Sequence, residues 1–311
     1  MTAVWDPRDL PSQTGKTFVV TGGNAGVGYF TCEQLAAAGG RVVIAARSRD
    51  KSDAAMGSIR SRVPGADVDF VTLDLASLAS IREAAAAITA LGPIDALINN
   101  AGLVIPPRRR RVTADGLELL VGGNALGHFA LTAQLFPALT AAGRVVGLGS
   151  MSTRMVRLDP SDLLSERRYR PFRAYAFSKH CVHGFAFELD RRLRAAGDTR
   201  RSLLAHPGFA VTGLAGKRPG VTDQDRGRRL AEIVLFSVVG QGKDDGAWST
   251  VRAAIDPDAE SGTFFGPSRM LLTGPPTPLA PVTSSASPEF GAHLWTLAEA
   301  KTGVRFDIRA P

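Results

Sequence analysis

The sequence predicts an α/β protein with a doubly wound, mostly parallel central sheet that is covered by helices on both faces. Strand-like and helix-like segments alternate through the first two thirds of the chain. The strand-like segments are rich in apolar residues, which indicates burial on both faces. A glycine-rich turn, TGGNAGVG at 21–28, follows the first strand and opens the first helix, as in dinucleotide-binding βαβ units.

The strands are recognised as short β-branched or aliphatic runs that end at glycine or polar residues. Six are expected in this part of the chain, at 17–22, 41–47, 67–75, 94–102, 143–150 and 201–208. The first helix reaches Ala38 and stops at Gly39-Gly40. Ser77 caps an alanine-rich helix that ends at about Leu91. Two longer helices are expected at about 113–141 and 172–196.

The alternation weakens after Gly208. Three elements are expected next, namely helices near 223–239 and 245–255 and a short strand around 263–265. The stretch 266–288 is rich in Pro, Ser and Thr and predicts an extended surface segment, followed by an amphipathic helix at 289–303. We therefore predict one domain over 1–311, with a core at about 15–214 and a C-terminal helical and extended appendage at about 215–311.

The chain shows no sequence feature of a secreted, membrane-spanning or metal-binding protein. The longest apolar stretches, near 42–46 and 234–239, are too short to cross a bilayer. The first residues lack the charged and apolar regions of a secretory signal. Cys32 and Cys181 have no metal-ligand or redox spacing, so reduced thiols and a cytoplasmic location are expected.

The formal net charge is +8, a balance that suits nucleic acid, an acidic membrane surface or anionic small molecules. The sharpest basic feature is the run Arg108–Arg111, just after two prolines. The sequence has no zinc-finger spacing, basic region with heptads or RNA-binding aromatic motif. We therefore predict no nucleic-acid partner and interpret the run as a solvated loop, with an anion or partner contact as the alternative.

The glycine-rich turn predicts a phosphate site. Gly22, Gly26 and Gly28 allow a tight turn and let a phosphate approach backbone N–H groups at the start of the helix. The end of the second strand indicates which dinucleotide is bound, because NAD-binding proteins usually carry a carboxylate there. Here the strand ends with Arg47, and no acid follows until Asp50. An arginine can hold a 2′-phosphate, so the sequence favours NADP(H).

A set of ordered motifs gives the sequence its family resemblance. The motifs are TGxxxGxG at 21–28, Asp74-Leu75, NNAG at 99–102, Asn124, Ser150, YxxxK at 175–179 and PGxxxT at 207–212. In this order and spacing the chain resembles a short-chain dehydrogenase/reductase with a Rossmann fold. The long interval between Ser150 and Tyr175, with GHF at 127–129, is similar to the retinol dehydrogenase-like and protochlorophyllide reductase-like branch.

The resemblance implies four catalytic residues, Asn124, Ser150, Tyr175 and Lys179. Tyr175 would protonate a carbonyl oxygen as hydride arrives, and Ser150 would hydrogen-bond the same oxygen. Lys179 would contact the nicotinamide ribose, and Asn124 would hold a water that links the lysine to solvent. Because Tyr175 and Lys179 share one face of a helix, we also expect the ammonium to lower the pKa of the phenol toward neutral pH.

The resemblance also implies a cofactor-binding set. Its members are Gly22, Asn24, Gly26, Val27, Gly28, Arg47, Asp74, Leu75, Asn100, Ala101, Gly102, Tyr175, Lys179, Pro207, Gly208 and Thr212.

Two departures from the family pattern bear on the site. Relatives often carry a double serine at the end of the fifth strand, whereas here Gly149 precedes Ser150 and Ser152 is the alternative. A glycine pair precedes Asn124, so the helix is expected to be kinked or to start late. We interpret three histidines near the motifs as structural, namely His128, His180 and His183.

The sequence thus predicts an NADP(H)-dependent oxidoreductase that acts on a carbonyl or alcohol carbon. Apolar residues and arginines in 151–172, 209–245 and the tail suggest a hydrophobic small-molecule substrate. A catalytically silent NADP(H)-binding sensor or scaffold protein is the alternative, and a nucleic-acid binder is the third. The two long helices allow a homo-oligomer, although the tail could cover some of their faces.

Overall fold

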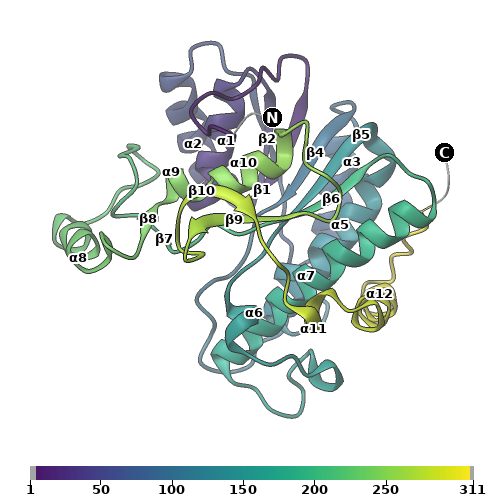
Figure 1. Ribbon diagram of the computed structural model, residues 1–311. Helices are drawn as coiled ribbons and strands as arrows, with labels where there is room; N and C mark the ends of the chain where they lie inside the picture. Colours follow the sequence, from purple (N-terminus) through teal and green to yellow (C-terminus); the bar gives the residue numbers. More distant parts are fainter. Residues whose placement is uncertain (1–4, 309–311) are drawn as a thin grey trace.

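The computed structural model describes residues 5–308, and one mixed sheet organises them (Figure 1). Its strands lie in the order β10-β9-β6-β5-β4-β1-β2-β3, and every neighbouring pair is parallel except β9 with β10. The strands are β1 Thr17–Thr21, β2 Arg41–Ala46, β3 Val68–Thr72, β4 Ile94–Asn99, β5 Leu139–Leu148, β6 Arg201–Ala205, β9 Phe264–Arg269 and β10 Thr273–Pro278. The predicted doubly wound fold is confirmed.

Helices cover both faces of the sheet and explain why its strands are apolar throughout. The main ones are α1 Gly26–Ala37, α2 Arg49–Arg62, α3 Leu78–Thr89, α5 Gly127–Leu135, α7 Pro171–Ala195, α10 Trp248–Ile255 and α12 Pro288–Thr302. In β1, Val19 belongs to the core beneath α3, α5 and α7, while its neighbours Phe18 and Val20 belong to the core beneath α1 and α10. Alternate side chains thus enter two separate cores.

The order of the strands reverses beside β1, which lies between β2 and β4. At such a reversal the loops leave in opposite directions and open a crevice at the carboxyl ends of the strands. The glycine turn follows β1 at this edge, and the segment Asn100–Gly102 follows β4. The fold therefore brings two of the predicted cofactor motifs together.

The helix expected at 113–141 starts later than predicted. Val112 forms an isolated bridge with Glu118, whose carboxylate then caps the helix by accepting from the N–H groups of Leu120 and Val121. Three segments precede or follow α5, namely α4 Leu119–Val121, the π-helical η1 Gly122–Leu126 and the 3₁₀-helical η2 Phe136–Ala138. The late start and the irregularity at the glycine pair are confirmed. The helical prediction is wrong for 113–118 and for 139–141, because β5 begins at Leu139.

The prediction of an extended surface segment at 266–288 is also wrong in part. The chain turns through Met270 and Leu271, which have φ angles of 51° and 63°, and returns as β10 against β9. The prolines of β10 fit this place, because the strand is at the edge of the sheet. A short helix, α11 Thr283–Ala286, then leads into α12, which ends at Gly303 with φ 67° as expected.

A smaller layer projects from the carboxyl edge of the sheet. It contains a two-stranded sheet of β7 Ala210–Val211 and β8 Gln241–Gly242, and the helices α8 Arg226–Phe236 and α9 Lys243–Gly246. None of the residues of α8 is buried, and the helix stands away from the main sheet at the left of Figure 1. The segment between β5 and α7 contains α6 Ser152–Met155 and the 3₁₀ turn η3 Pro160–Asp162.

The helical stretch Leu119–Ala138 is long and apolar enough to cross a membrane. In this structure 78% of its most apolar window is buried within the protein, as in many core helices. It is therefore weak evidence for a span. The sequence did not reveal it because Gly, Asn, His and Thr interrupt the run.

Candidate active site

The three motif glycines of the turn, Gly22, Gly26 and Gly28, have different surroundings. A Cβ added to Gly22, where φ is 66°, would lie 3.1 Å from Cα of Ala101. A Cβ on Gly28 would overlap the side chain of Asn100. These two glycines let the turn pack tightly on the segment after β4. At Gly26, with φ 62°, an added Cβ would meet only the flexible end of the Lys243 side chain, at 3.7 Å, and no backbone atom within 4 Å outside the turn and its helix.

Thr21 and Asn100 fix this packing. The Asn100 amide donates to the carbonyl oxygen of Thr21 at 2.7 Å, and the Ala101 N–H donates to Oγ1 of Thr21 at 2.9 Å. Both side chains are buried. The crevice is thus built by hydrogen bonds between the ends of β1 and β4.

Ser150 lies just beyond β5, and its hydroxyl faces Tyr175 on α7. The Ser150 side chain interacts with the Tyr175 phenol, and its Oγ accepts the N–H of Ser152 at 3.2 Å. The alternative, Ser152, is 4% exposed and its hydroxyl has no hydrogen-bond partner within the described residues. The structure therefore pairs Ser150, and not Ser152, with the tyrosine.

A buried histidine supports Ser150 from behind. The N–H of Ser150 donates to Nε2 of His183 at 3.3 Å, and a Cβ on Gly149 would overlap that same nitrogen. The missing second serine thus has a physical reason, because Gly149 makes room for the imidazole. Burial holds the pKa of His183 well below its usual range, so the ring is neutral and can accept. The sequence indicates only a structural role for His183, because its contact with the N–H of Ser150 depends on the fold.

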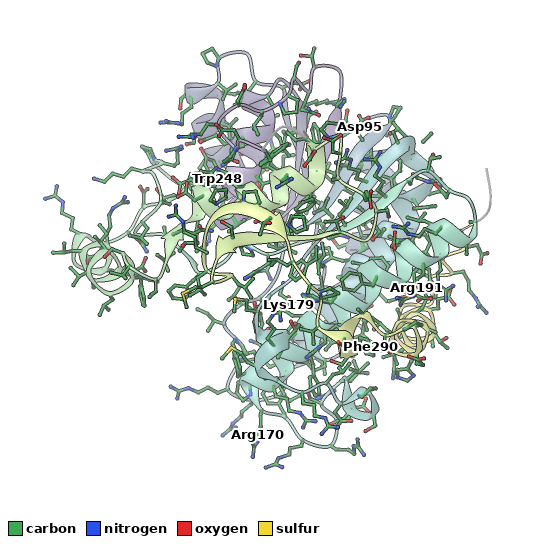
Figure 2. All side chains as sticks on the ribbon, viewed as in Figure 1. Asp95, Arg170, Lys179, Arg191, Trp248 and Phe290 are labelled. Carbon is green, nitrogen blue, oxygen red and sulfur yellow. The ribbon has the colours of Figure 1, made fainter. Side chains whose placement is uncertain are left out.

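Tyr175 and Lys179 lie one turn apart on α7, and Lys179 lies near the centre of the molecule (Figure 2). The lysine is 4% exposed, and its ammonium donates to the carbonyl oxygen of Leu148 at 2.7 Å. Burial lowers the pKa of Lys179 to about 8. The lysine is therefore anchored to β5, directly before Ser150.

The expectation of a lowered pKa for the Tyr175 phenol is wrong. Burial raises the pKa of Tyr175 above its ordinary value, and the interaction with Ser150 offsets only part of this. The ammonium of Lys179 is bonded to Leu148 and does not counter the burial. At neutral pH Tyr175 is accordingly a protonated phenol, which is the form that donates a proton.

Asn124 lies in the π-helical segment and is 2% exposed. Its Oδ1 accepts the N–H of Leu103 at 2.8 Å, and its amide donates to Oγ of Ser178 at 3.0 Å. A Cβ on Gly102 would lie 3.4 Å from Oδ1 of Asn124 and 3.6 Å from Nζ of Lys179. Asn124 thus ties the loop after β4 to α7 beside the lysine, and its predicted role in holding a water stays a prediction.

His128 completes the buried network. Its Nδ1 lies 2.9 Å from the carbonyl oxygen of Asn124, and its Nε2 lies 2.9 Å from Oγ1 of Thr21. Burial lowers the pKa of His128 to about 4. His180, next to Lys179, contacts Ser285 and Val156 through its two ring nitrogens at 2.6 and 2.8 Å. Both histidines make the structural contacts that were expected.

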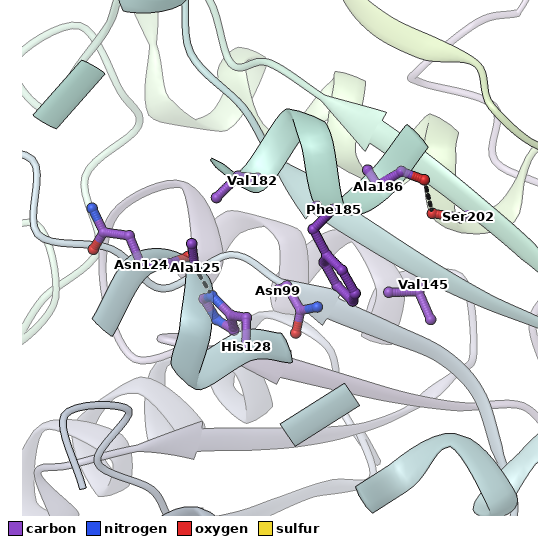
Figure 3. Close-up of a pocket in the computed structure, with 10 residues that line it drawn as sticks. Asn99, Asn124, Ala125, His128, Val145, Val182, Phe185, Ala186 and Ser202 are labelled. Atoms are coloured by element: carbon purple, nitrogen blue, oxygen red, sulfur yellow. Dashed lines mark hydrogen bonds between the residues drawn. The ribbon is translucent and has the colours of Figure 1, made fainter. Parts of the chain in front are cut away.

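A small apolar cavity lies behind Asn124, between α5, α7 and the sheet (Figure 3). Its lining includes Asn99, His128, Val182 and Phe185, whereas Ser150 and Tyr175 do not border it. It is therefore an internal cavity that is separate from Ser150 and Tyr175.

The remaining predicted cofactor residues border the same carboxyl edge. Asp74-Leu75 follows β3, and the Asp74 carboxylate accepts the N–H of Ala76 at 2.9 Å. Pro207-Gly208 follows β6, with φ 71° at Gly208, and Thr212 directly follows β7. Asn24 and Val27 belong to the glycine turn. Arg47 directly follows β2, is exposed, and forms no ion pair with the described residues.

The geometry combines a dinucleotide crevice with a serine, a phenol and a lysine. A family model described as short chain dehydrogenase matches residues 16–219. The chain belongs to the short-chain dehydrogenase/reductase family. Membership confirms the predicted enzyme class, an oxidoreductase that interconverts an alcohol and a carbonyl group.

Similar proteins confirm the predicted branch of the short-chain dehydrogenase/reductases. Polyprenol dehydrogenase from Mus musculus is 40% identical over 261 residues, which cover 82% of this chain and 76% of the relative. Retinol dehydrogenase 13 from Homo sapiens is 41% identical over 211 residues, which cover 67% of this chain and 62% of the relative.

Two solved structures agree with the fold. A crystal structure of an uncharacterised protein from Mycobacterium Paratuberculosis has a TM-score of 0.79 and 35% identity, and the match covers 98% of this chain and 99% of that one. A short chain dehydrogenase from Burkholderia cenocepacia, solved in complex with NADP, has a TM-score of 0.58 and 23% identity. That match covers 78% of this chain and 91% of the other, and its likeness is one of fold.

Proposed function

We propose that this short-chain dehydrogenase/reductase is an NADP(H)-dependent enzyme that interconverts a lipophilic alcohol and its aldehyde or ketone. The observation that carries the proposal is the convergence of Ser150 and Tyr175 beside the buried Lys179, at the crevice lined by the glycine turn. This arrangement provides a proton donor and a second hydrogen-bond donor for one substrate oxygen.

The cofactor preference is inferred from the end of β2. Arg47 is exposed there, makes no ion pair within residues 5–308, and has no carboxylate beside it until Asp50. A guanidinium in this place suits a 2′-phosphate, which a carboxylate would repel. The turn at Gly26 has only the end of the Lys243 side chain beside it, and a phosphate suits the N–H groups that begin α1 there.

When bound, NADP(H) supplies or accepts the hydride. In reduction, Tyr175 donates its phenolic proton to the carbonyl oxygen, and the Ser150 hydroxyl hydrogen-bonds the same atom. Lys179, with a pKa of about 8, is mostly protonated at neutral pH and supplies a positive charge one turn from Tyr175 on α7. His183 accepts the backbone N–H of Ser150 and so positions the serine, while the serine hydroxyl meets the substrate.

The substrate class is inferred from exposed apolar residues on α6, on α8 and on the loop after β4. Met155 on α6 is 71% exposed, Val104 after β4 is 64% exposed, and Leu230 and Val234 on α8 are 63% and 70% exposed. Such residues suit contact with an apolar ligand. Two relatives are named for polyprenol and retinol, which are both lipophilic alcohols.

The test is NADPH oxidation, followed by absorbance, with a panel of aldehydes that includes retinal, shorter isoprenoid aldehydes and a polar control. We expect turnover with the lipophilic aldehydes and a loss of at least about a hundredfold in kcat for Tyr175→Phe. Tyr169→Phe is the matched control, because the Tyr169 hydroxyl donates to the carbonyl of Pro107 and not to the site. Full activity of Tyr175→Phe would reject the proposed proton donor.

A second measurement tests the cofactor preference. Arg47→Asp is expected to shift the ratio of kcat/KM values from NADPH toward NADH, because a carboxylate repels the 2′-phosphate. An unchanged ratio would mean that Arg47 does not contact this group.

A further inference from the structure

A lysine that belongs to none of the motifs lies at the glycine turn. A Cβ on Gly26 would come 3.7 Å from Nζ of Lys243, and Lys243 supplies the only described atoms within 4 Å of that position. In a dinucleotide-binding turn, the middle glycine is the one whose bare backbone the pyrophosphate approaches. The Lys243 ammonium therefore lies over the face of the turn that a pyrophosphate would meet.

The backbone that carries Lys243 is well anchored. Lys243 directly follows β8, which pairs in parallel with β7, and Thr212 directly follows β7. The two residues thus leave neighbouring strands at the same end. The next residue, Asp244, accepts a hydrogen bond on its carbonyl oxygen from Gln34 at 2.9 Å and on its carboxylate from the N–H of Gly216 at 3.0 Å. These bonds hold the segment against α1.

The Lys243 side chain is partly buried, and no carboxylate of the described residues is in direct contact with its ammonium. It forms no hydrogen bond or ion pair with the residues that the structure describes. Burial lowers the pKa of Lys243, the nearby Glu232 carboxylate partly offsets this, and Arg228 adds to it. Glu232 is already bonded to the N–H of Gly213 at 2.7 Å. A dianionic group at the turn would supply the missing partner.

We infer that Lys243 binds the pyrophosphate of the dinucleotide from the side opposite the N–H groups of the glycine turn. The inference depends on the proposed function only in requiring that a nicotinamide dinucleotide binds. NADPH and NADH have the same pyrophosphate, so Lys243 contributes to the affinity of both. Arg47, at the 2′-phosphate, contributes to the affinity of NADPH alone.

The experiment is titration calorimetry of the full chain and its Lys243→Gln variant with NADPH, NADH, ADP-ribose and 2′-AMP. We expect the variant to bind the three pyrophosphate compounds about tenfold or more weakly, as for the loss of one charge-assisted hydrogen bond. Its affinity for 2′-AMP, which has no pyrophosphate, should be unchanged. Lys243→Arg should recover most of the affinity, because the cation is retained.

Lys301→Gln is the matched control, because it removes the same charge from an exposed position on α12 and should bind all four compounds like the parent chain. Unchanged affinity of Lys243→Gln for ADP-ribose would overturn the inference. Weaker binding confined to NADPH and 2′-AMP would also overturn it, because the lysine would then contact the 2′-phosphate. A parent chain that binds no dinucleotide removes both proposals, whereas one that binds dinucleotides but reduces no carbonyl removes the proposed function alone.

Discussion

Gly149 and His183 act as a pair, because the imidazole occupies the volume that a side chain at position 149 would need. Gly149→Ser is therefore expected to lower the free energy of unfolding by about 1–3 kcal/mol through overpacking. It should also lower kcat more than it raises KM, since Ser150 would lose the bond from its N–H to His183. Chemical unfolding and steady-state kinetics of the variant measure both effects.

Gly57→Ala is the matched control for this prediction. Gly57 lies within α2, and a Cβ there would meet nothing within 4 Å. Alanine should raise the free energy of unfolding by about 1 kcal/mol, because it favours the helix. A Gly149→Ser variant as stable and as active as the parent would contradict the pairing of Gly149 with His183.

Lys179 predicts opposite pH effects on activity and stability. The pKa of its ammonium is about 8 in the folded chain and 10.5 ordinarily, so unfolding takes up a proton between these values. The contribution of Lys179 to the free energy of unfolding should therefore rise with pH across this window, by up to about 3 kcal/mol. Burial raises the pKa values of the Cys32 and Cys181 thiols, and their contributions fall with pH in the same range. The rate of carbonyl reduction should fall in the same window, because Lys179 then loses its positive charge one turn from Tyr175.

Lys179→Met isolates the contribution of this group to the pH dependence. The variant should lose the rise in stability between pH 8 and 10.5, while other lysines and tyrosines titrate as before. An identical pH dependence in both chains would show that Lys179 is not desolvated in the folded state.

At the residue scale, the sequence predicts the reacting groups better than their protonation. Ser150, just after β5, interacts with Tyr175 on α7, and Lys179 lies one turn along the same helix, as the motif spacing predicts. Their catalytic roles stay predictions. The raised pKa of Tyr175 could not be predicted, because it depends on burial and on the bond from Lys179 to Leu148. Lys243 was missed for a similar reason, because it is far from Gly26 in the sequence and belongs to no motif.

Among the elements, the irregular helix that carries Asn124 packs closely on the backbone after β3. A Cβ on Gly127 would overlap the carbonyl oxygen of Leu75, whereas one on Gly123 would meet nothing within 4 Å. Gly127→Ala should therefore lower the free energy of unfolding by about 1–3 kcal/mol, and Gly123→Ala should leave it unchanged or raise it slightly. Urea unfolding of the two variants compares them directly, and equal effects would count against this packing.

The predictions of secondary structure are correct where a local sequence pattern determines the element. They are wrong where pairing with a distant segment determines it. Ser77 caps α3 through the N–H of Ser80, as its position before an alanine-rich run indicates. The prolines of β10 favour an extended surface segment, and only pairing with β9 makes them part of the sheet. The helix at 113–141 was placed too early, because the bridge between Val112 and Glu118 cannot be read from periodicity.

At the scale of the whole molecule, α12 is part of the hydrophobic core beneath α5 and α7. Trp295 is 3% exposed and packs edge-to-face on Phe129 with ring centroids 5.2 Å apart. It also stacks on Phe306 at 4.9 Å. Trp295→Ala should lower the free energy of unfolding by about 3–5 kcal/mol. Val238→Ala, at a position 91% exposed, should change it by less than about 0.5 kcal/mol, and thermal unfolding can separate the two.

The position of α12 against α7 and α5 has a consequence for how the enzyme matures during synthesis (Figure 1). The helix that carries Tyr175 and Lys179 obtains its outer layer from residues near the end of the chain. While those residues are still inside the ribosome, the apolar side of α7 is open to water and to chaperones. Catalytic competence should therefore appear only after Phe306 has left the exit tunnel, long after the nucleotide-binding half has been made.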